Sequence, residues 1–322
     1  MKAVKGFCRV AVTAVALSVW TGTPSHAQDD EATRLAQKVV ALYEAGHFAE
    51  ALPLARQSLA LREKELGPDD TKVATSLNVL GLVQYSAGNY DDAEPLYKRS
   101  LAIFEKALGP EREEVAGVLN NLGELYRMEA RYADAEPLLK RSIAIREKTT
   151  GADTPDIVPA LSNLANVYCS QGRLEEAEPL LKRSLAVLEK AGGRDNPDIA
   201  IVLSNLADIY SNEGRYADAE RLLHRSLALA KKAFGPNHPN VAQALNNLSA
   251  VAFKQGRYAD AERLLKRSIA INEKALGPNH PEMANLLQNL GDLYKAEGRI
   301  ADAESLMKRS AVIREKATAK PI

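Results

Sequence analysis

The sequence predicts an all-α protein in which one helix-turn-helix unit is repeated seven times. Two series of glycines, each with a spacing of 42 residues, indicate the repeat. One series is Gly46, Gly88, Gly172, Gly214, Gly256 and Gly298, with Ala130 in the remaining place, and the other is Gly67, Gly109, Gly151, Gly193, Gly235 and Gly277. The segments 214–226 and 256–268, GRYADAERLLHRS and GRYADAERLLKRS, are nearly identical. The period holds without insertion from residue 46 to residue 298, which leaves no segment for a separate catalytic domain.

Residues 1–27 are predicted to be a secretory signal peptide. A basic start, an uncharged run and small residues at positions −3 and −1 of a cleavage site follow one another, as in such peptides. These are Lys2, Lys5 and Arg9, then Val10 to Trp20, then Ser25 and Ala27. We expect cleavage before Gln28 and a periplasmic or secreted location in a bacterial envelope. An uncleaved membrane anchor is the alternative, although the run is short for a bilayer core of about 30 Å.

The charge balance argues against a dedicated nucleic-acid binder, because such proteins carry a basic excess that neutralises phosphates. The chain has 42 Lys and Arg and 42 Asp and Glu. Residues 1–27 hold three basic and no acidic residues, so the chain after cleavage has 39 basic and 42 acidic residues. Cleavage also removes Cys8 and leaves Cys169 as a single cysteine, which cannot form an internal disulfide.

Each repeat is predicted to contain two amphipathic helices, as the third repeat illustrates. In residues 113–128 the apolar residues fall three and four positions apart, which is typical of a helix with one buried face. They are Val115, Val118, Leu119, Leu122, Leu125 and Tyr126. Residues 131–148 continue the pattern after a turn at Ala130. On these second helices a Glu precedes a Lys by four residues, as in Glu94 and Lys98, which predicts surface ion pairs.

Prolines and polar residues mark the start of the first helix in most repeats. Pro155, Pro197, Pro239 and Pro281 stand where the first helical residue is expected. Asp70, Thr154 and Asn196 precede that position and are favourable N-caps, whereas Arg112, His238 and His280 are weaker ones. The repeats are expected to start near residues 31, 71, 113, 155, 197, 239 and 281, within an array over 28–316 followed by a flexible tail at 317–322.

These residues resemble the tetratricopeptide repeat. The family pattern of Leu-Gly, a Tyr three residues on, a small residue at the turn and an Ala early in the second helix is matched by Leu122, Gly123, Tyr126, Ala130 and Ala135. The longer unit, with Leu-Asn-Asn-Leu in its first helix, is similar to the repeats of kinesin light chains. The resemblance implies a right-handed α-solenoid of seven units, with the first helices lining a concave face and the second helices forming a convex one.

One column of the first helices carries asparagine at five successive repeats, although asparagine is a mediocre helix former. The column and its neighbours form the predicted peptide-binding groove: Asn78, Asn120, Asn121, Asn163, Asn166, Asn205, Asp208, Asn246, Asn247, Asn289 and Asp292. A side-chain amide offers a donor and an acceptor, so a ladder of amides suits the backbone of an extended peptide, and the family binds peptides at this place. The alternative is that these amides join neighbouring helices.

The sequence therefore favours a non-catalytic scaffold that binds a peptide segment or a protein partner, with no cofactor, no metal site and no catalytic residues. No phosphate-binding loop, nucleophile motif or metal-ligand spacing is present. His238 and His280 lie in loops one repeat apart, where repeat duplication explains them better than a metal does. The alternative is a structural or assembly spacer in an envelope complex that acts through its ends or its convex face. No membrane insertion is expected after cleavage, and self-association through the terminal repeats is possible.

Overall fold

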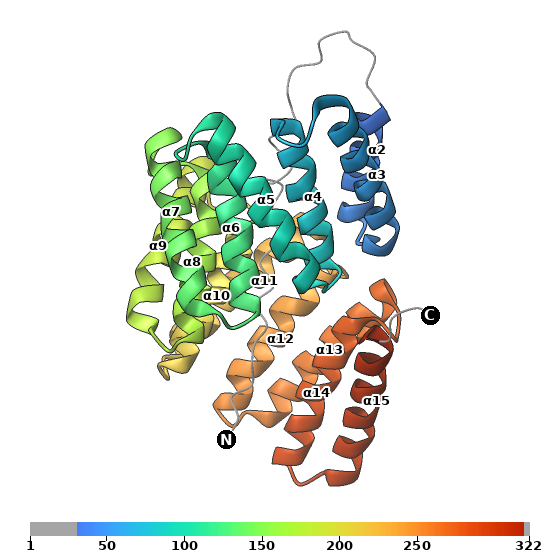
Figure 1. The fold of residues 1–322 in the computed structure, drawn as a ribbon. Coiled ribbons are helices and arrows are strands. Elements are labelled where there is room, and N and C mark those ends of the chain that lie inside the picture. The colour runs from blue at the N-terminus through green and yellow to red at the C-terminus, as the bar shows by residue number, and fades with distance from the viewer. Residues whose placement is uncertain (1–30, 319–322) are drawn as a thin grey trace. The chain divides into compact units, whose positions relative to one another are not determined.

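The computed structural model describes residues 31–318, with side chains described as far as Glu315. This part of the chain contains fourteen α-helices, one short 3-10 helix and no β-strand. It divides into two compact units, residues 31–187 and 188–318, and each is described by itself. Helix α9 (Leu174–Gly192) contributes residues to both units (Figure 1).

First and second helices alternate along the chain. The earlier helices are α2 (Glu31–Glu44), α3 (Phe48–Leu66), α4 (Thr71–Ser86), α5 (Tyr90–Leu108), α6 (Glu113–Met128), α7 (Tyr132–Thr149), the 3-10 helix η1 (Pro155–Ile157) and α8 (Val158–Ser170). After α9 follow α10 (Ile199–Asn212), α11 (Tyr216–Phe234), α12 (Pro239–Lys254), α13 (Tyr258–Leu276), α14 (Pro281–Ala296) and α15 (Ile300–Thr318). Even-numbered labels denote the first helix of a repeat and odd-numbered labels the second. Helix α15 includes the first two residues of the predicted tail, and the rest of the tail and the predicted signal peptide lie outside the described residues.

Two backbone hydrogen bonds close the turn inside the second repeat, and the other turns follow the same pattern. The amide of Gly88 donates to Tyr85 (3.0 Å) and that of Asn89 donates to Gln84 (2.9 Å). Gly88 has a φ of 82°, a left-handed conformation that glycine adopts without steric cost. Ala130 takes the same position with a φ of 59° and is the one non-glycine residue with positive φ within residues 31–318. The first glycine series therefore marks helix turns.

The start of the first helix varies between repeats. Pro239 and Pro281 begin α12 and α14, as predicted. Pro155 instead begins η1, and Pro197 lies two residues before α10, so neither of them begins an α-helix. The reason at Pro197 is local: the amide of Ala200 donates to Pro197 with a three-residue spacing, which is a 3-10 bond of the kind found at helix ends.

The N-cap side chains also differ in strength. The Asp70 carboxylate accepts a hydrogen bond from the backbone amide of Lys72 at 2.7 Å. The two histidines cap as well, since a neutral imidazole has one acceptor nitrogen. Nδ1 of His238 accepts from Asn240 at 3.1 Å, and Nδ1 of His280 accepts from Glu282 at 3.3 Å. The histidine bonds are longer than the aspartate bond. Because each histidine caps a helix, both loop histidines have a structural role.

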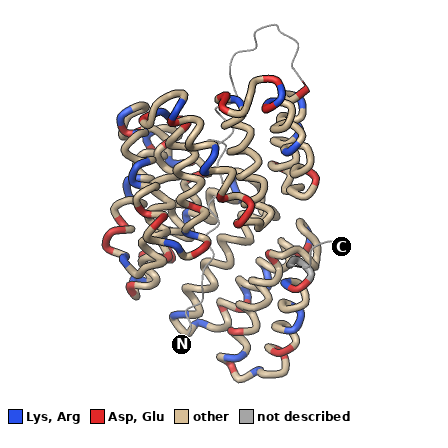
Figure 2. Tube along the Cα trace, viewed as in Figure 1, with Lys and Arg blue, Asp and Glu red and all other residues tan. Residues whose placement is uncertain are grey.

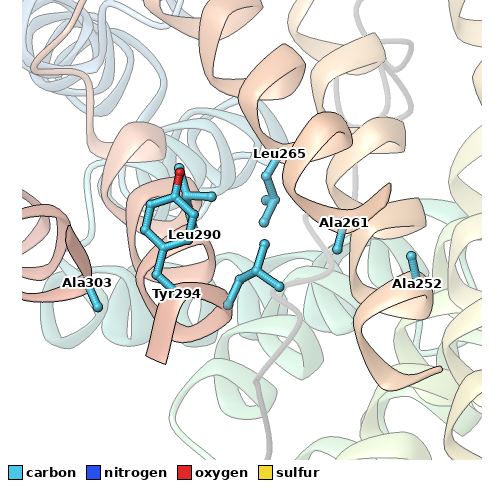
Figure 3. Close-up of a cluster of buried hydrophobic side chains, with 7 residues drawn as sticks. Ala252, Ala261, Leu265, Leu290, Tyr294 and Ala303 are labelled. Carbon is cyan, nitrogen blue, oxygen red and sulfur yellow. The ribbon is translucent and has the colours of Figure 1, made fainter. Parts of the chain in front are cut away.

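Small residues allow the two helices of a repeat to pack closely. The second helices carry a column of alanines, all 0% exposed: Ala51, Ala93, Ala135, Ala177, Ala219, Ala261 and Ala303. The first helices contribute glycine at some facing positions. A Cβ added to Gly123 would lie 2.7 Å from Cγ of Leu139, so the site has no room for a larger residue. Figure 3 shows side chains of α12 to α15, among them Ala261, Leu265 and Tyr294, that form one such cluster in the second unit.

A buried serine joins the two helices in most repeats. The Ser142 hydroxyl of α7 donates to the backbone oxygen of Ala116 in α6 at 2.8 Å. The same bond, with a separation of 26 residues, is made by Ser58, Ser100, Ser226, Ser268 and Ser310. Ser184 is the exception, because its hydroxyl donates to Leu180 of its own helix. The serine is thus an internal polar contact of the repeat rather than part of an exposed surface.

None of the helices within residues 31–318 combines the length and the apolar content that a bilayer crossing requires.

Candidate functional site

The asparagines of the first unit are connected to one another across three first helices. Nδ2 of Asn163 donates to Oδ1 of Asn120 (3.1 Å), and Nδ2 of Asn121 donates to Oδ1 of Asn78 (3.1 Å). A longer contact of 3.5 Å from Asn120 to Oδ1 of Asn121 joins the two pairs. The four amides therefore form one chain from α8 through α6 to α4, in which Asn163 and Asn121 each donate to the preceding repeat and Asn120 donates within α6.

The second unit has a shorter version of the same arrangement. Nδ2 of Asn289 on α14 donates to Oδ1 of Asn246 on α12 at 2.9 Å. Oδ1 of Asn247 accepts instead from Gln243 of its own helix at 2.9 Å. The position that would pair with Asn247 in the preceding repeat is Ser204, whose hydroxyl donates to Ala200 of its own helix at 3.0 Å. The chain of amides is therefore interrupted where serine replaces asparagine.

The predicted site residues differ in how much surface they present. Asn163 and Asn205 are 2% and 3% exposed, and Asn166 is also buried. Oδ1 of Asn163 is buried without a hydrogen-bond partner among the described residues. The remaining predicted residues are half-buried: Asn78, Asn120, Asn121, Asp208, Asn246, Asn247, Asn289 and Asp292. The column thus consists of a few buried amides flanked by amides and carboxylates that reach the surface.

Glu124 stands one turn beyond the asparagine column and is occupied by an internal ion pair. Both of its oxygens accept from the Arg127 guanidinium at 2.7 Å, and Oε1 also accepts from the Tyr85 hydroxyl at 3.0 Å. The side chains of Glu124 and Arg127 are only 10% and 14% exposed. With three hydrogen bonds and little exposed surface, Glu124 links α6 to α4 and offers little to a ligand.

Asp208 on α10 is the predicted site residue with the most altered acidity. Burial raises the pKa of its carboxyl to about 6, and the positive charge of Lys254 on α12 opposes that rise. Burial correspondingly lowers the pKa of the Lys254 ammonium. Nζ of Lys254 donates to Asn212 at 2.8 Å, one turn beyond Asp208 on the same helix. Asp292, the matching carboxylate on α14, accepts from Gln288 at 3.3 Å.

A three-residue clamp between successive repeats was not predicted from the sequence. The Tyr126 hydroxyl on α6 donates to Glu94 on α5 at 2.8 Å, and the Arg131 guanidinium donates to the same carboxylate at 3.1 Å. The guanidinium also stacks on the tyrosine ring, 3.8 Å from its centre. Tyr168, Arg173 and Glu136 repeat the arrangement, as do Tyr294, Arg299 and Glu262. The recurrence of Tyr and Arg every 42 residues is the sequence signal that could have indicated this clamp.

The clamp carboxylates also make the ion pairs that the Glu-Lys spacing predicts. Glu94 meets Lys98 at 2.7 Å, Glu136 meets Lys140 at 2.6 Å, and Glu262 meets Lys266 at 2.8 Å. Figure 2 shows acidic and basic residues interspersed along the helices. Hydrogen bonds from the lysine, the tyrosine and the arginine hold the pKa of Glu94 at about 2. Each of these carboxylates therefore serves the junction between two repeats.

The described residues contain no group of three or more His, Cys, Asp or Glu side chains arranged to hold a metal ion. His238 and His280 act as helix caps, as described above, and Cys169 is half-buried on α8. The chemistry available on the first helices is thus hydrogen bonding by amides and carboxylates.

The model of the tetratricopeptide repeat family matches residues 30–106, 82–148, 156–220, 198–274 and 241–316, which together span most of the chain. The chain belongs to the tetratricopeptide repeat family. The predicted fold class, an all-α solenoid of tetratricopeptide units, is confirmed, and so is the predicted likeness to kinesin light chain repeats. A sequence comparison with curated proteins gives no match.

Three solved structures illustrate the likeness of this tetratricopeptide chain to others in fold. A kinesin light chain-like protein of Podosopora anserina, with nearly identical TPR-like repeats, is 24% identical over 64% of this chain and 98% of its own, with a TM-score of 0.54. The Rap conjugation gene regulator of plasmid pLS20, in complex with the Phr* peptide, is 15% identical over 87% and 72%, with a TM-score of 0.66. The type IV pilus biogenesis factor PilW is 19% identical over 73% and 90%, with a TM-score of 0.52.

Proposed function

We propose that this tetratricopeptide repeat protein is a non-catalytic scaffold that binds an extended peptide segment of a protein partner along the concave face of its first helices. The observation that carries the proposal is the amide chain formed by Asn163, Asn120, Asn121 and Asn78. Membership of a family of interaction scaffolds supports it, as does the likeness in fold to a Rap regulator in complex with a peptide.

The amide chain suits a peptide backbone because it is held in place before a ligand arrives. Each amide group has two N–H donors and an oxygen with two lone pairs. A bond to the neighbouring repeat uses one donor of Asn121 or Asn289 and fixes the plane of the side chain. The second donor and the remaining lone pairs stay available. Binding by a fixed side chain costs less conformational entropy than binding by a mobile one.

We assign the two hypotheses for the asparagine column, peptide binding and helix joining, to different members of the column. Buried Asn163 and Asn205 stabilise the array and orient their neighbours. The half-buried members, such as Asn78, Asn246 and Asn247, contact the peptide. Asp208 and Asp292, on α10 and α14 of the second unit, favour a partner that presents donors or positive charge. The buried Asn166 belongs with the first group.

Peptide selection followed by calorimetry tests the proposal. Twelve-residue peptides are selected from a random display library against residues 28–322, and the affinity of the best peptide is measured by titration calorimetry. The double variant Asn247→Ala with Asp292→Ala removes two half-buried groups. Each of them has its internal partner on its own helix, Gln243 on α12 and Gln288 on α14. We expect this variant to bind at least about tenfold more weakly, which corresponds to about 1.4 kcal/mol.

A control double variant, Gln57→Ala with Asp91→Ala, changes one amide and one carboxylate that are exposed on second helices. We expect it to bind as the unaltered chain does. If both double variants keep full affinity, the first helices of the second unit do not bind the peptide.

A second function, assembly within an envelope complex, is favoured by one feature of the last helix. Ile300 and Val312 on α15 are 51% and 42% exposed, and PilW shares the fold. Under this alternative the terminal repeat associates with a further copy or with another subunit. Analytical ultracentrifugation tests it, because a mass that rises with concentration and falls back in an Ile300→Ser, Val312→Ser variant supports end-to-end association.

We also infer that the chain is exported, with residues 1–27 as the signal, and that it acts in the periplasm or outside the cell. Fractionation of expressing cells tests this inference. A cytoplasmic chain that still carries Lys2 would contradict it.

A further inference from the structure

The stretch from Arg221 to Ala259 contains no acidic residue. Its basic residues are Arg221, Arg225, Lys231, Lys232, Lys254 and Arg257. The stretch covers most of α11, the loop after it and α12. Four of these basic residues pair with acidic residues outside the stretch, and Lys254 donates to Asn212. Lys231 is the one basic residue of the stretch that has no such partner among the described residues.

Successive second helices are normally joined by an arginine and a glutamate. Arg225 on α11 meets Glu189 on α9 at 2.6 Å and also donates to the backbone oxygen of Arg194 at 3.2 Å. The same two contacts recur at other junctions. The ion pairs are Arg99 with Glu63, Arg141 with Glu105, Arg183 with Glu147 and Arg309 with Glu273, at 2.6 to 2.8 Å.

At the junction of α11 and α13 the glutamate is replaced by Lys231. The arginine of this column is Arg267, which therefore stands opposite a positive charge. Lys231 is half-buried and Arg267 is exposed, and neither makes an ion pair or side-chain hydrogen bond among residues 31–315. Because Lys231 replaces the glutamate of the usual ion pair, the N–H donors of the Arg267 guanidinium remain available to another molecule.

A second acidic residue is also replaced at this junction. Elsewhere an acid in the loop before the first helix binds the lysine near the end of the second helix, as Asp195 binds Lys232 at 2.7 Å and Asp69 binds Lys106 at 2.6 Å. In this repeat the loop residue is Asn237, and its lysine is Lys274, which is exposed. Lys274 therefore adds a third cation whose usual carboxylate is missing.

An exposed aromatic ring accompanies these cations. Phe234 is 44% exposed and stacks on the His238 ring, with their centres 4.7 Å apart. It follows Lys231 by three residues on α11, so the two side chains share a face of the helix. In other repeats the arginine equivalent to Arg267 contacts the loop that follows the second helix of the preceding repeat, as Arg225 does. For Arg267 this is the loop that begins at Gly235, after α11. The three cations and the ring thus surround one loop.

We propose that Lys231, Phe234, Arg267 and Lys274, here called the basic patch, form a docking site for an acidic segment of a protein partner. A carboxylate of the partner meets Arg267 as Glu189 meets Arg225, and an apolar neighbour in the partner covers Phe234. A protein is the occupant that the observations favour, because the replaced groups at this junction are carboxylates. Three cations on a chain with balanced charge are few for a nucleic acid, which is bound through a larger basic surface.

Fluorescence anisotropy with a labelled decaglutamate peptide tests the proposal on residues 28–322. Lys231→Glu restores the glutamate found at the other junctions, so this variant keeps the fold while it neutralises Arg267. We expect binding that weakens as salt is added and a loss of at least about tenfold in affinity in Lys231→Glu and in Arg267→Ala. The control Lys64→Glu makes the same charge change at an exposed lysine of α3 and leaves the affinity within about twofold.

Absence of decaglutamate binding, or equal losses in Lys231→Glu and Lys64→Glu, would overturn the proposal. Tighter binding of a labelled ten-nucleotide oligothymidine, with the same dependence on Lys231, would overturn it in favour of a nucleic-acid site. Thermal unfolding of Lys231→Glu at or above the temperature of the unaltered chain shows that a loss of binding is not a loss of fold.

Discussion

Nδ2 of Asn163 lies 3.1 Å from Oδ1 of Asn120, which belongs to the preceding repeat 43 residues earlier in the chain. Asn120 is in turn in contact with Asn121, whose amide continues to Asn78. This relationship means that the asparagine column is a connected network before any ligand binds. Under the proposed function the buried members of the column stabilise the array, and the half-buried members that they orient keep hydrogen-bonding capacity for a peptide.

Replacing the middle of this network should weaken the junction between α6 and α8. Asn120→Ala removes the acceptor of buried Asn163 and the donor to Asn121. Leaving a buried amide without its partner costs about 1–3 kcal/mol. We expect faster hydrogen exchange in α6 and α8, measured by mass spectrometry because a repeat array need not unfold in one step. Gln57→Ala, at an exposed amide of α3, is the control, and equal exchange in both variants would refute a stabilising role for the network.

The inter-helix serine gives a prediction with a natural control. Ser142→Ala removes a buried hydrogen bond between α7 and α6 and should lower the free energy of local unfolding by about 1 kcal/mol. Ser184→Ala removes a serine that is equally buried but bonded within its own helix, so its cost should be smaller. Hydrogen exchange of each repeat measures the difference. A larger effect at Ser184 than at Ser142 would contradict the assignment.

Two glycines of α6 should respond to alanine in opposite directions. At Gly123 the new methyl group would lie 2.7 Å from Leu139, and such overpacking costs about 1–3 kcal/mol. At Gly117 no atom lies within 4 Å of the new methyl group, and alanine in a helix is favoured over glycine by roughly 0.5–1 kcal/mol. We expect Gly123→Ala to lower the melting temperature and Gly117→Ala to raise it. Shifts of the same sign would show that α6 packs differently.

The clamp carboxylates predict a loss of stability in acid. The pKa values of Glu94, Glu136 and Glu262 are held at about 2, below the ordinary 4.5, chiefly by hydrogen bonds from Lys98, Arg173 and Lys266 respectively. A carboxyl whose pKa is lower in the folded state stabilises the fold above pH 4.5, and this contribution is lost as the pH falls from 4.5 toward 2.

Thermal unfolding at pH 7, 4.5, 3 and 2 measures this effect. The triple variant Glu94→Gln, Glu136→Gln, Glu262→Gln should melt at a lower temperature at pH 7 and should approach the unaltered chain at pH 2. Melting curves that stay equally far apart at all four pH values would mean that these carboxylates do not cause the acid sensitivity.

The repeat length, the turn glycines and the alanine column made the fold predictable, because a 42-residue period imposes the same local structure at each copy. The start of α10 was less predictable. Pro197 has the sequence context of Pro239, yet a 3-10 bond from Ala200 shifts the helix start by two residues. Such differences depend on local hydrogen bonds that the repeat pattern does not specify.

The candidate site was predictable as a column but not as a network. The period places Asn121 and Asn163 at equivalent positions, but the burial of Asn163 depends on how closely α6 and α8 pack. The hydrogen bonds of Glu124 with Arg127 and Tyr85 involve two different helices, so they could not be inferred from spacing within one repeat. The basic patch, in contrast, leaves a signal in the sequence, because Lys231 and Asn237 stand at positions where the 42-residue period places acidic residues in the preceding repeats.

Photo-crosslinking of a selected peptide most directly tests the claim that the first helices bind a partner. Benzoylphenylalanine is placed at Gln243, which bonds Asn247 on the same face of α12, or at Arg263, which is exposed on the second helix α13. The account predicts that the peptide crosslinks at position 243 and not at position 263. A crosslink at position 263 without one at position 243 would contradict it.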